Sequence, residues 1–370
     1  MVILYIIIFI FIFSSIYLGM HYYVYTRIIT GLMLKVPAIN YLKTFFLIAA
    51  LSFVLSEYLS RHISTSWVKY FAYLGVIWIG IISISFSVFF ISDIFKIFIH
   101  TQNFKYYSTI CSIIAILLVT AFSLYNVSRE IRIKEVKIKI DKVPRELSGF
   151  TIVQLSDVHV DLLKSVKWLD DIVSKTNALN PDLIVITGDL IDYDLCNLEE
   201  YCKILKKLKS KYGVYGITGN HEYYTGYEKF LNIAENINMK VLKNEKVTIA
   251  DSIELVGTND EAGKRFPGGS PDLKLALKGS DFKKPVILLA HRPTRFKEAV
   301  DLGVDLQLSG HTHAGQIPPV DLITKLIFKY PYGLHKLKSS YIYTTFGTGT
   351  WGPPMRLFSR SEIVKIILEK

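Results

Sequence analysis

The stretch FTIVQLSDVH, residues 150–159, joins an apolar run to an aspartate and a histidine. Its first six residues have the composition of a buried strand, which ends at Ser156 and Asp157. Comparable runs, each followed by Asp, Asn or His beside a Gly, Ser or Pro, occupy residues 183–187, 214–218, 286–290 and 306–308. In α/β sheets, ligand sites gather beyond the carboxyl ends of the strands, so we expect these polar residues to meet.

The segments between the strands complete this pattern. Residues 166–179 and 198–209 have helical periodicity and lysine-rich faces. Strands that alternate with helices predict an α/β sheet core. Residues 131–140 nearly alternate between apolar and charged side chains, which indicates a half-buried strand. We therefore predict a soluble domain over residues 129–370, with almost no linker before it.

The polar residues at the strand ends are the candidate metal ligands. They supply carboxylate, amide and imidazole donors, which suit Mn²⁺, Fe²⁺ or Zn²⁺ better than Ca²⁺. In an extended chain, residues i and i+2 face the same side, so Asp157 and His159, like His311 and His313, can enter one site together. Asp189 can bridge two cations through its two oxygens. The set has enough donors for two cations.

Five sequence blocks, in order, resemble those of the calcineurin-like metallophosphoesterases. They are Ser156-Asp157-Val158-His159, Thr187-Gly188-Asp189, Gly219-Asn220-His221-Glu222, Ala290-His291-Arg292-Pro293 and Ser309-Gly310-His311-Thr312-His313. The resemblance covers roughly residues 135–370. The tail, Gly347-Thr348-Gly349-Thr350 and Gly352-Pro353-Pro354-Met355-Arg356, resembles a membrane-associated bacterial branch. That branch includes UDP-2,3-diacylglucosamine pyrophosphatase-like enzymes and exported phosphoesterases.

This resemblance implies a fold, a cofactor and residue roles. The fold would be a four-layered αββα sandwich, and the cofactor two divalent ions: Mn²⁺, Fe²⁺ or Zn²⁺. One ion would take Asp157, His159, Asp189 and His313. The other would take Asp189, Asn220, His291 and His311, so that Asp189 bridges. His221 would be the catalytic acid-base residue rather than a ligand.

The first third of the chain has a different composition. Residues 1–26, 70–92 and 106–128 contain no Asp, Glu, Lys or Arg, and each is long enough to cross a bilayer, which takes about 20 residues. Residues 44–60 form a weaker fourth candidate, interrupted by Glu57. We therefore predict a membrane domain over residues 1–128 with about four transmembrane helices. The protein would be a multi-pass protein of the cell membrane, and the loop charges leave the side of the catalytic domain undecided.

The charge distribution predicts the partners. Of the net charge of +11, most lies in residues 1–140, which carry 12 Lys and Arg against four Asp and Glu. These residues flank the predicted spans, so we expect contact with anionic lipids and not with nucleic acid. The cysteines at 111, 196 and 202 are interpreted as packing residues, and His21, His62 and His100 as interfacial ones.

Together these features predict a membrane-anchored phosphoesterase. It would hydrolyse a phosphodiester or pyrophosphate bond, with a lipid-linked or amphipathic phosphate as the preferred substrate. The alternatives are an anchored nucleotide phosphodiesterase or pyrophosphatase, and a non-catalytic membrane sensor or scaffold. Two further alternatives stay open. Arg292, Arg295 and Arg356 are either phosphate-binding or salt-bridge residues, and the apolar residues within 317–337 form either a buried packing helix or a lip that contacts the bilayer.

Overall fold

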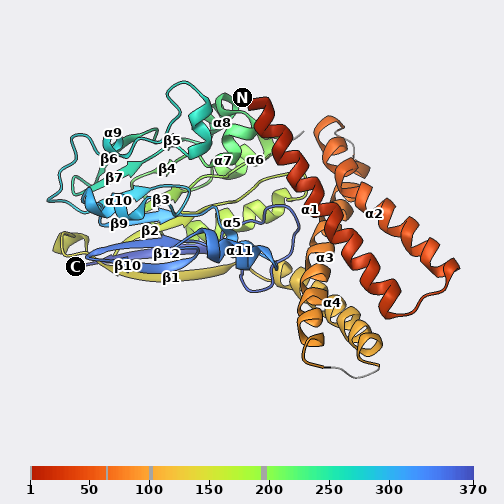
Figure 1. The fold of residues 1–370 in the computed structure, drawn as a ribbon. Coiled ribbons are helices and arrows are strands. Elements are labelled where there is room, and N and C mark those ends of the chain that lie inside the picture. The colour runs from red at the N-terminus through yellow and green to blue at the C-terminus, as the bar shows by residue number, and fades with distance from the viewer. Residues whose placement is uncertain (1, 64–65, 100–102, 193–197) are drawn as a thin grey trace. The chain divides into compact units, whose positions relative to one another are not determined.

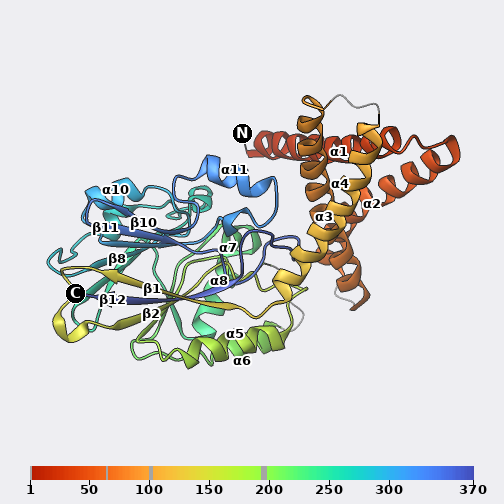
Figure 2. The same cartoon turned by 90° about the horizontal axis from the view of Figure 1, so that it is seen from below.

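The computed structural model describes residues 2–63, 66–99, 103–192 and 198–370 (Figures 1 and 2). These residues form two compact units. The first, the helical unit, contains Met1–Arg129 with two short segments from later in the chain, Gln316–Val320 and Gly352–Leu357. The second, the sheet unit, contains Glu130–Gly315, Asp321–Trp351 and Phe358–Lys370.

The helical unit is built on long apolar helices. They are α1 (Val2–Gly31), α2 (Val36–His62), α3 (Ser66–Lys96) and α4 (Phe104–Ser128). Within the described residues, three stretches are long and apolar enough to cross a membrane: Val36–Ser60, Trp67–Lys96 and Phe104–Ser128. The weakest sequence candidate, residues 44–60, therefore belongs to a helix of sufficient length. The number of crossings remains a prediction.

The two short segments are attached to α3 and α4 by specific contacts. Ser83 Oγ of α3 donates to the carbonyl oxygen of Pro318 at 2.8 Å. Near the end of α4, Asn126 Nδ2 donates to the Arg356 carbonyl at 2.9 Å, and the Arg356 amide donates to the Ser123 carbonyl at 3.1 Å. A Cβ on Gly80 of α3 would lie against Met355, so the glycine permits this approach. The sequence pattern contains no signal for this attachment.

The sheet unit contains two mixed six-stranded sheets among its described residues. The first has the order β1-β12-β2-β3-β4-β5 and the second β10-β11-β9-β8-β7-β6. The first comprises β1 (Arg132–Lys139), β2 (Phe150–Leu155), β3 (Leu183–Ile186), β4 (Val214–Gly216), β5 (Met239–Val241) and β12 (Glu362–Glu369). The second comprises β6 (Glu245–Ile249), β7 (Ile253–Gly257), β8 (Val286–Leu289), β9 (Leu306–Ser309), β10 (Gly333–Leu337) and β11 (Ser340–Thr344).

Helices and short 3₁₀ turns connect these strands. The helices are α5 (Val166–Ala178), α6 (Leu198–Leu205), α7 (Asn220–Thr225), α8 (Tyr227–Asn236), α9 (Leu273–Ala276), α10 (Phe296–Asp301) and α11 (Val320–Ile327). The turns are η1 (Arg145–Leu147), η2 (Glu261–Arg265) and η3 (His313–Gly315). In α5, Leu169, Ile172, Val173 and Thr176 are buried, at the spacing of one helix face.

Three apolar clusters define four layers. Because side chains alternate along a strand, β3 sends Leu183 and Val185 to one face, and Ile184 and Ile186 to the other. The first face packs against the second sheet, and the other packs against α5 and α6. The second sheet alternates in the same way, and its outer face packs against α9 and α10. This confirms the predicted α/β fold with αββα layers.

The predicted strands that carry the candidate ligands correspond closely to β2, β3, β4, β8 and β9. Strands β2, β3 and β4 are parallel and in register, with Leu155 opposite Ile186 and Ile186 opposite Gly216. In the second sheet, β8 and β9 are also parallel. Aligned strand ends bring their following residues to one edge of each sheet.

One prediction for the first third of the chain was wrong. His21 was expected at a solvated interface, but it is buried in the helical unit, where Trp78 Nε1 donates to its Nε2 at 2.8 Å. Cys202 packs against the core of the first sheet, whereas Cys111 is exposed on α4. Cys196, His100 and the side chain of His62 lie outside the described residues.

Candidate metal centre

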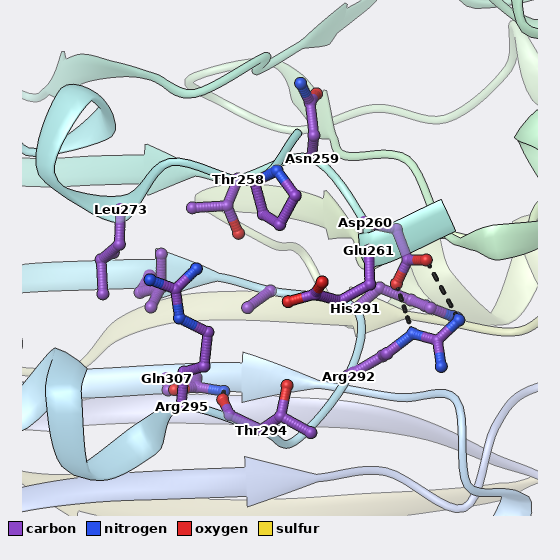
Figure 3. A pocket seen from close by; sticks show the side chains of 13 residues that line it. Thr258, Asn259, Asp260, Glu261, Leu273, His291, Arg292, Thr294, Arg295 and Gln307 are labelled. Atoms are coloured by element: carbon purple, nitrogen blue, oxygen red, sulfur yellow. Dashed lines mark hydrogen bonds and ion pairs between the residues drawn. The ribbon is translucent and has the colours of Figure 1, made fainter. Parts of the chain in front are cut away.

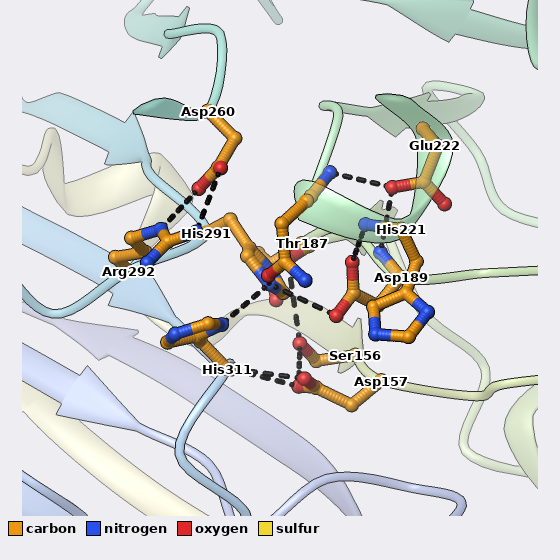
Figure 4. A network of polar contacts seen from close by, with 12 residues as sticks. Ser156, Asp157, Thr187, Asp189, His221, Glu222, Asp260, His291, Arg292 and His311 are labelled. Carbon is orange, nitrogen blue, oxygen red and sulfur yellow. Dashed lines mark hydrogen bonds and ion pairs between the residues drawn. The ribbon is translucent and has the colours of Figure 1, made fainter. Parts of the chain in front are cut away.

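The candidate ligands meet at the carboxyl ends of five strands, and Figure 4 shows Asp157, Asp189, His291 and His311 among them. Asp157 and His159 follow β2, and Asp189 follows β3. Asn220 opens α7 after β4, while His291 follows β8 and His311 follows β9. Strands β2, β3 and β8 end in buried apolar residues, β4 ends in buried Gly216 and β9 in buried Ser309, so the core holds the start of each loop in place. All the ligand candidates predicted from the sequence lie in this cluster, with His221 beside them.

The backbone of the cluster is not extended, contrary to our expectation for the i, i+2 pairs. Asp157 and His159 have φ of 52° and 48°, and His311 and His313 have φ of 71° and 49°. Asp189 is also left-handed, at 53°. Such conformations cost a non-glycine residue about 1–3 kcal/mol and concentrate at functional sites. The pairs converge because the chain turns sharply after each strand, not because a strand continues.

Two glycines permit the close approach of neighbouring loops. A Cβ on Gly310 would collide with Ser156 Oγ and with the Asp157 carboxylate. A Cβ on Gly219 would collide with the Asp189 carboxylate. Since no other residue lacks a Cβ, these positions bring the His311 and Asn220 loops into contact with the two aspartates.

The first ligand group contains Asp157, His159 and His313. Nε2 of His159 lies 3.1 Å from Nε2 of His313, which lies 3.4 Å from Asp157 Oδ1. On its other side, the His159 ring directs Nδ1 to Asp192 Oδ1 at 2.6 Å. A neutral ring that donates from Nδ1 presents a lone pair at Nε2, the atom that faces the group. Asp157 is itself held by the His311 amide, at 2.9 Å from Oδ1.

The second group converges on Nε2 of His291. Asp189 Oδ2, Asn220 Oδ1 and His311 Nδ1 each lie 3.2 Å from it. On the other side of the ring, Nδ1 lies 2.7 Å from the carbonyl oxygen of Thr187, to which it donates. In the neutral ring this fixes the tautomer and leaves Nε2 with a lone pair. Four electron-pair donors thus point toward one place.

Asp189 lies between the two groups. Its Oδ2 is 3.2 Å from His291 Nε2 and 3.7 Å from His159 Nε2, whereas its Oδ1 accepts from the His221 amide at 2.9 Å. Oδ2 therefore faces a histidine of each ligand group, so Asp189 would contribute to both. Potential ligand atoms of His159, Asp189 and His221 also lie within 4.8 Å of one another. His221 is therefore within reach of a cation as well as of a substrate.

The sequence analysis missed one residue of the centre, Asp192. Its Oδ1 lies 2.6 Å from His159 Nδ1 and 2.9 Å from His221 Nδ1, so one buried carboxylate orients both rings. Metal-binding histidines usually donate their second nitrogen in this way. The available signal was the position of Asp192, three residues after Asp189 in the same loop.

Glu222 is a second buried carboxylate whose role the sequence left open. It accepts from the amides of Asp189, Leu190 and Gly219, at 3.0, 2.8 and 2.6 Å. The carboxylate therefore joins the loop after β3 to the loop after β4. Burial, followed by the nearby Asp189, raises the pKa of Glu222 to about 7.

The buried carboxylates create a strong demand for positive charge. Burial opposes protonation of His291, but the carboxylates around it, Asp189 first, raise its pKa to about 10. Burial likewise opposes charge on His221, whereas Asp192 and Asp189 raise its pKa to about 9. Burial and the neighbouring His291 and Arg292 lower the pKa of His311 to about 3, which keeps this imidazole neutral. Such a site is suited to cations.

The candidate phosphate-binding arginines have other partners. Arg292 forms a bidentate pair with buried Asp260, at 2.8 and 3.2 Å, beside His291 (Figure 3). Arg295 pairs with Glu298 on the surface, and Arg356 is buried in the helical unit. Arg292 and Arg295 thus match the salt-bridge alternative. Both also line a cavity of about 40 Å³.

Aromatic side chains surround the open side of the centre. The rings of Tyr224 and Trp351 lie 5.6 and 6.1 Å from the His221 ring, and both side chains are more than half exposed. Phe328 lies 5.7 Å from the His311 ring. The approach to the ligand groups is therefore partly apolar.

Comparison with known proteins places this fold and centre in one family. Residues 150–315 match the family described as "Calcineurin-like phosphoesterase". An uncharacterized metallophosphoesterase of Aquifex aeolicus is 34% identical over 65% of this chain and 92% of its own length. The chain belongs to the calcineurin-like phosphoesterase family.

Other matches cover less of the relative's length. A transmembrane protein with metallophosphoesterase domain from Danio rerio is 35% identical over 71% of this chain. An uncharacterized metallophosphoesterase of Helicobacter pylori strain 26695 is 39% identical over 64%. The match spans 63% and 64% of these two proteins' lengths. The resemblance to the UDP-2,3-diacylglucosamine pyrophosphatase-like branch is not tested by these matches and stays a prediction.

Proposed function

We propose that this protein is an integral, multi-pass cell-membrane phosphoesterase that uses two divalent cations to hydrolyse a phosphodiester or pyrophosphate bond. The observation that carries the proposal is the pair of ligand groups on either side of Asp189 Oδ2. Family membership supports the reaction class, and the long apolar helices support the membrane location.

The donor set fits two cations. Nitrogen ligands lie about 2.0–2.1 Å from Zn²⁺, so two of them at the tetrahedral angle are separated by about 3.3–3.4 Å. The separations of 3.1 Å between His159 and His313 and 3.2 Å between His291 and His311 come close to this value. The first ion would be held by Asp157, His159, Asp189 and His313. The second would be held by Asp189, Asn220, His291 and His311.

The proposed ligand set carries little negative charge, which suits an anionic substrate. Only Asp157 and Asp189 contribute carboxylates to the proposed set, and Asn220 contributes a neutral oxygen. When bound, Mn²⁺, Fe²⁺ or Zn²⁺ would polarise the phosphoryl group and make hydroxide available near neutral pH. The identity of the ions is part of the proposal.

His221 would supply the proton for the leaving oxygen. Asp192 accepts from its Nδ1, so Nε2 remains available for the substrate. The amide of His221 donates to Asp189 Oδ1, which links the ring position to the proposed bridging ligand. This part of the chain would therefore align the acid with the ligand groups before the substrate arrives.

The preferred substrate class is a lipid-linked or amphipathic phosphate. Tyr224, Trp351 and Phe328 provide apolar contact beside the ligand groups, and the helices keep the protein in the membrane. Membrane lipids would then surround the helices of the protein and also supply its substrate.

The decisive experiment combines metal analysis with turnover of bis(p-nitrophenyl) phosphate. We expect close to two Mn²⁺, Fe²⁺ or Zn²⁺ per purified chain, and hydrolysis that a chelator abolishes and added metal restores. A metal-free protein that fails to hydrolyse diesters, pyrophosphates and lipid phosphates after metal addition would instead be a sensor or scaffold.

A further inference from the structure

Helix α11, labelled in Figure 1, buries two polar side chains and exposes its apolar ones. Asp321 and Thr324 are buried, whereas Leu326 and Ile327 are 87% and 68% exposed. Val320, Leu322 and Ile323 are exposed on the same side of the helix. This contradicts the packing-helix alternative, because a packing helix buries its apolar side.

The chain before α11 is attached to the helical unit. Pro318 lies two residues before Val320, the first residue of α11. Its carbonyl accepts a hydrogen bond from Ser83 of α3. Ile317 packs with Ile84 of α3 and with Met355. The other short segment of the helical unit, Gly352–Leu357, is hydrogen-bonded through the Arg356 carbonyl to Asn126, in the last turn of α4. The start of α11 is thus attached to two helices that are long enough to span a bilayer.

The charges beside the apolar surface favour a lipid partner. Lys325 and Lys329 are exposed among the apolar residues of this segment. An amphipathic helix with apolar residues and flanking lysines binds at the boundary between headgroups and acyl chains, with its apolar side inserted by about 5–10 Å. Anionic headgroups would add an attraction of about 1 kcal/mol for each lysine close to the surface.

The same segment leads directly to the proposed metal centre. Phe328 follows the last residue of α11, and its ring contacts the ring of His311 at 5.7 Å. A molecule whose acyl chains lie along Leu326 and Ile327 would therefore have its headgroup close to the ligand groups. A phosphate held at a bilayer surface could reach the centre without leaving the membrane.

We propose that α11 inserts into the surface of the bilayer that holds the helical unit, and that it guides acylated phosphates to the metal centre. Only the second part of this inference, guidance of acylated phosphates, rests on the proposed phosphoesterase function. The first part, insertion, concerns the helix itself and is tested without catalysis.

Insertion is tested with the full-length protein in nanodiscs of phosphatidylcholine and phosphatidylglycerol. A fluorophore is attached to Leu326→Cys in a chain that also carries Cys111→Ser, Cys196→Ser and Cys202→Ala. The control label is Leu275→Cys on α9, another exposed leucine. We expect lipids with a quencher in the upper acyl chain to quench the label at 326 and not the label at 275. Equal quenching at the two sites, or self-quenching between copies at 326, would overturn the proposal.

The guidance of acylated phosphates to the metal centre is tested with an unlabelled double variant, Leu326→Ser with Ile327→Ser. Phe328 is left intact because it contacts His311. Its substrates are the p-nitrophenyl phosphodiester of dioleoylglycerol in the nanodisc and soluble methyl p-nitrophenyl phosphate. We expect the variant to lose at least about tenfold in turnover of the lipid diester, because two apolar contacts with the lipid are removed, with the soluble diester unaffected.

The outcomes separate the two proposals. An equal loss on both diesters, together with a lower melting temperature, would mean that α11 supports the fold. Undiminished lipid turnover would exclude guidance. If the unmodified protein with added Mn²⁺ hydrolyses neither diester, the proposed function fails, while the quenching result still decides whether α11 enters the bilayer.

Discussion

Nε2 of His159 lies 3.1 Å from Nε2 of His313, although the two histidines are 154 residues apart in the chain. Asp192 accepts from the opposite side of the His159 ring, so this ring presents a lone pair toward His313. The contact joins the end of a strand in the first sheet to a loop of the second sheet. It is the geometry expected of two ligands to one ion.

Asp189→Asn tests the proposed bridge. The change keeps the size of the side chain but removes the charge that two cations would share. We expect loss of at least one metal per chain by elemental analysis, and loss of nearly all diester hydrolysis. The matched control is Asp171→Asn, an exposed carboxylate paired with Lys175, which should leave both values unchanged. Full metal content with normal turnover in Asp189→Asn would contradict the two-metal assignment.

His221→Ala separates acid catalysis from metal binding. If His221 protonates the leaving oxygen, the variant should retain both metals while turnover falls by about 10² to 10⁴. The loss should be larger for alkyl than for p-nitrophenyl leaving groups, because a poor leaving group needs the proton more. Since His221 is close enough to Asp189 and His159 to contact a cation, a missing metal would show that it is a ligand.

Asp192→Asn tests the carboxylate that orients two histidines. Both rings contact the same oxygen, Asp192 Oδ1, and a neutral amide oxygen binds them less strongly than a carboxylate, so His159 and His221 should be held less firmly in position. We expect metal affinity to fall by about 10- to 100-fold. Metal titrations followed by diester turnover measure this fall. Excess Mn²⁺ should restore metal content but only part of the turnover, because His221 remains misplaced. Unchanged metal affinity would mean that Asp192 is not needed to position His159.

Gly310→Ala tests the close approach between the two sheets' loops. The added Cβ would collide with Ser156 Oγ and the Asp157 carboxylate, which must move. We expect weaker metal binding and a fall of about 1–3 kcal/mol in the free energy of unfolding, as for other overpacked positions. Gly19→Ala is the control, because nothing lies within 4 Å of the added Cβ. An active Gly310→Ala protein with normal metal content would show that the loops can separate without loss.

The residue pattern was sufficient for the α/β sheet core and for most of the candidate centre, whereas the αββα layers were expected only from the family resemblance. Strands β2, β3, β8 and β9 are short apolar runs bounded by turn residues, and they begin and end within about a residue of their predicted positions. The ligand candidates were recognisable because metal binding restricts their chemistry to carboxylate, amide and imidazole donors. Asp192 was not recognisable, since an acid that orients a ring looks the same in sequence as an acid on the surface.

The sequence by itself determined the apolar helices, the α/β sheet core and the types of candidate ligand, because each depends on local composition and spacing. Only the tertiary structure decided how these parts meet. Left-handed turns at Asp157, His159, Asp189, His311 and His313 depend on contacts with other loops, as the collision expected at Gly310 shows. The exposure of Leu326 and Ile327 likewise followed from which side of α11 the rest of the protein covers. A helical stripe in the sequence is the same whether it faces a core or a membrane, and only the surrounding chain distinguishes the two.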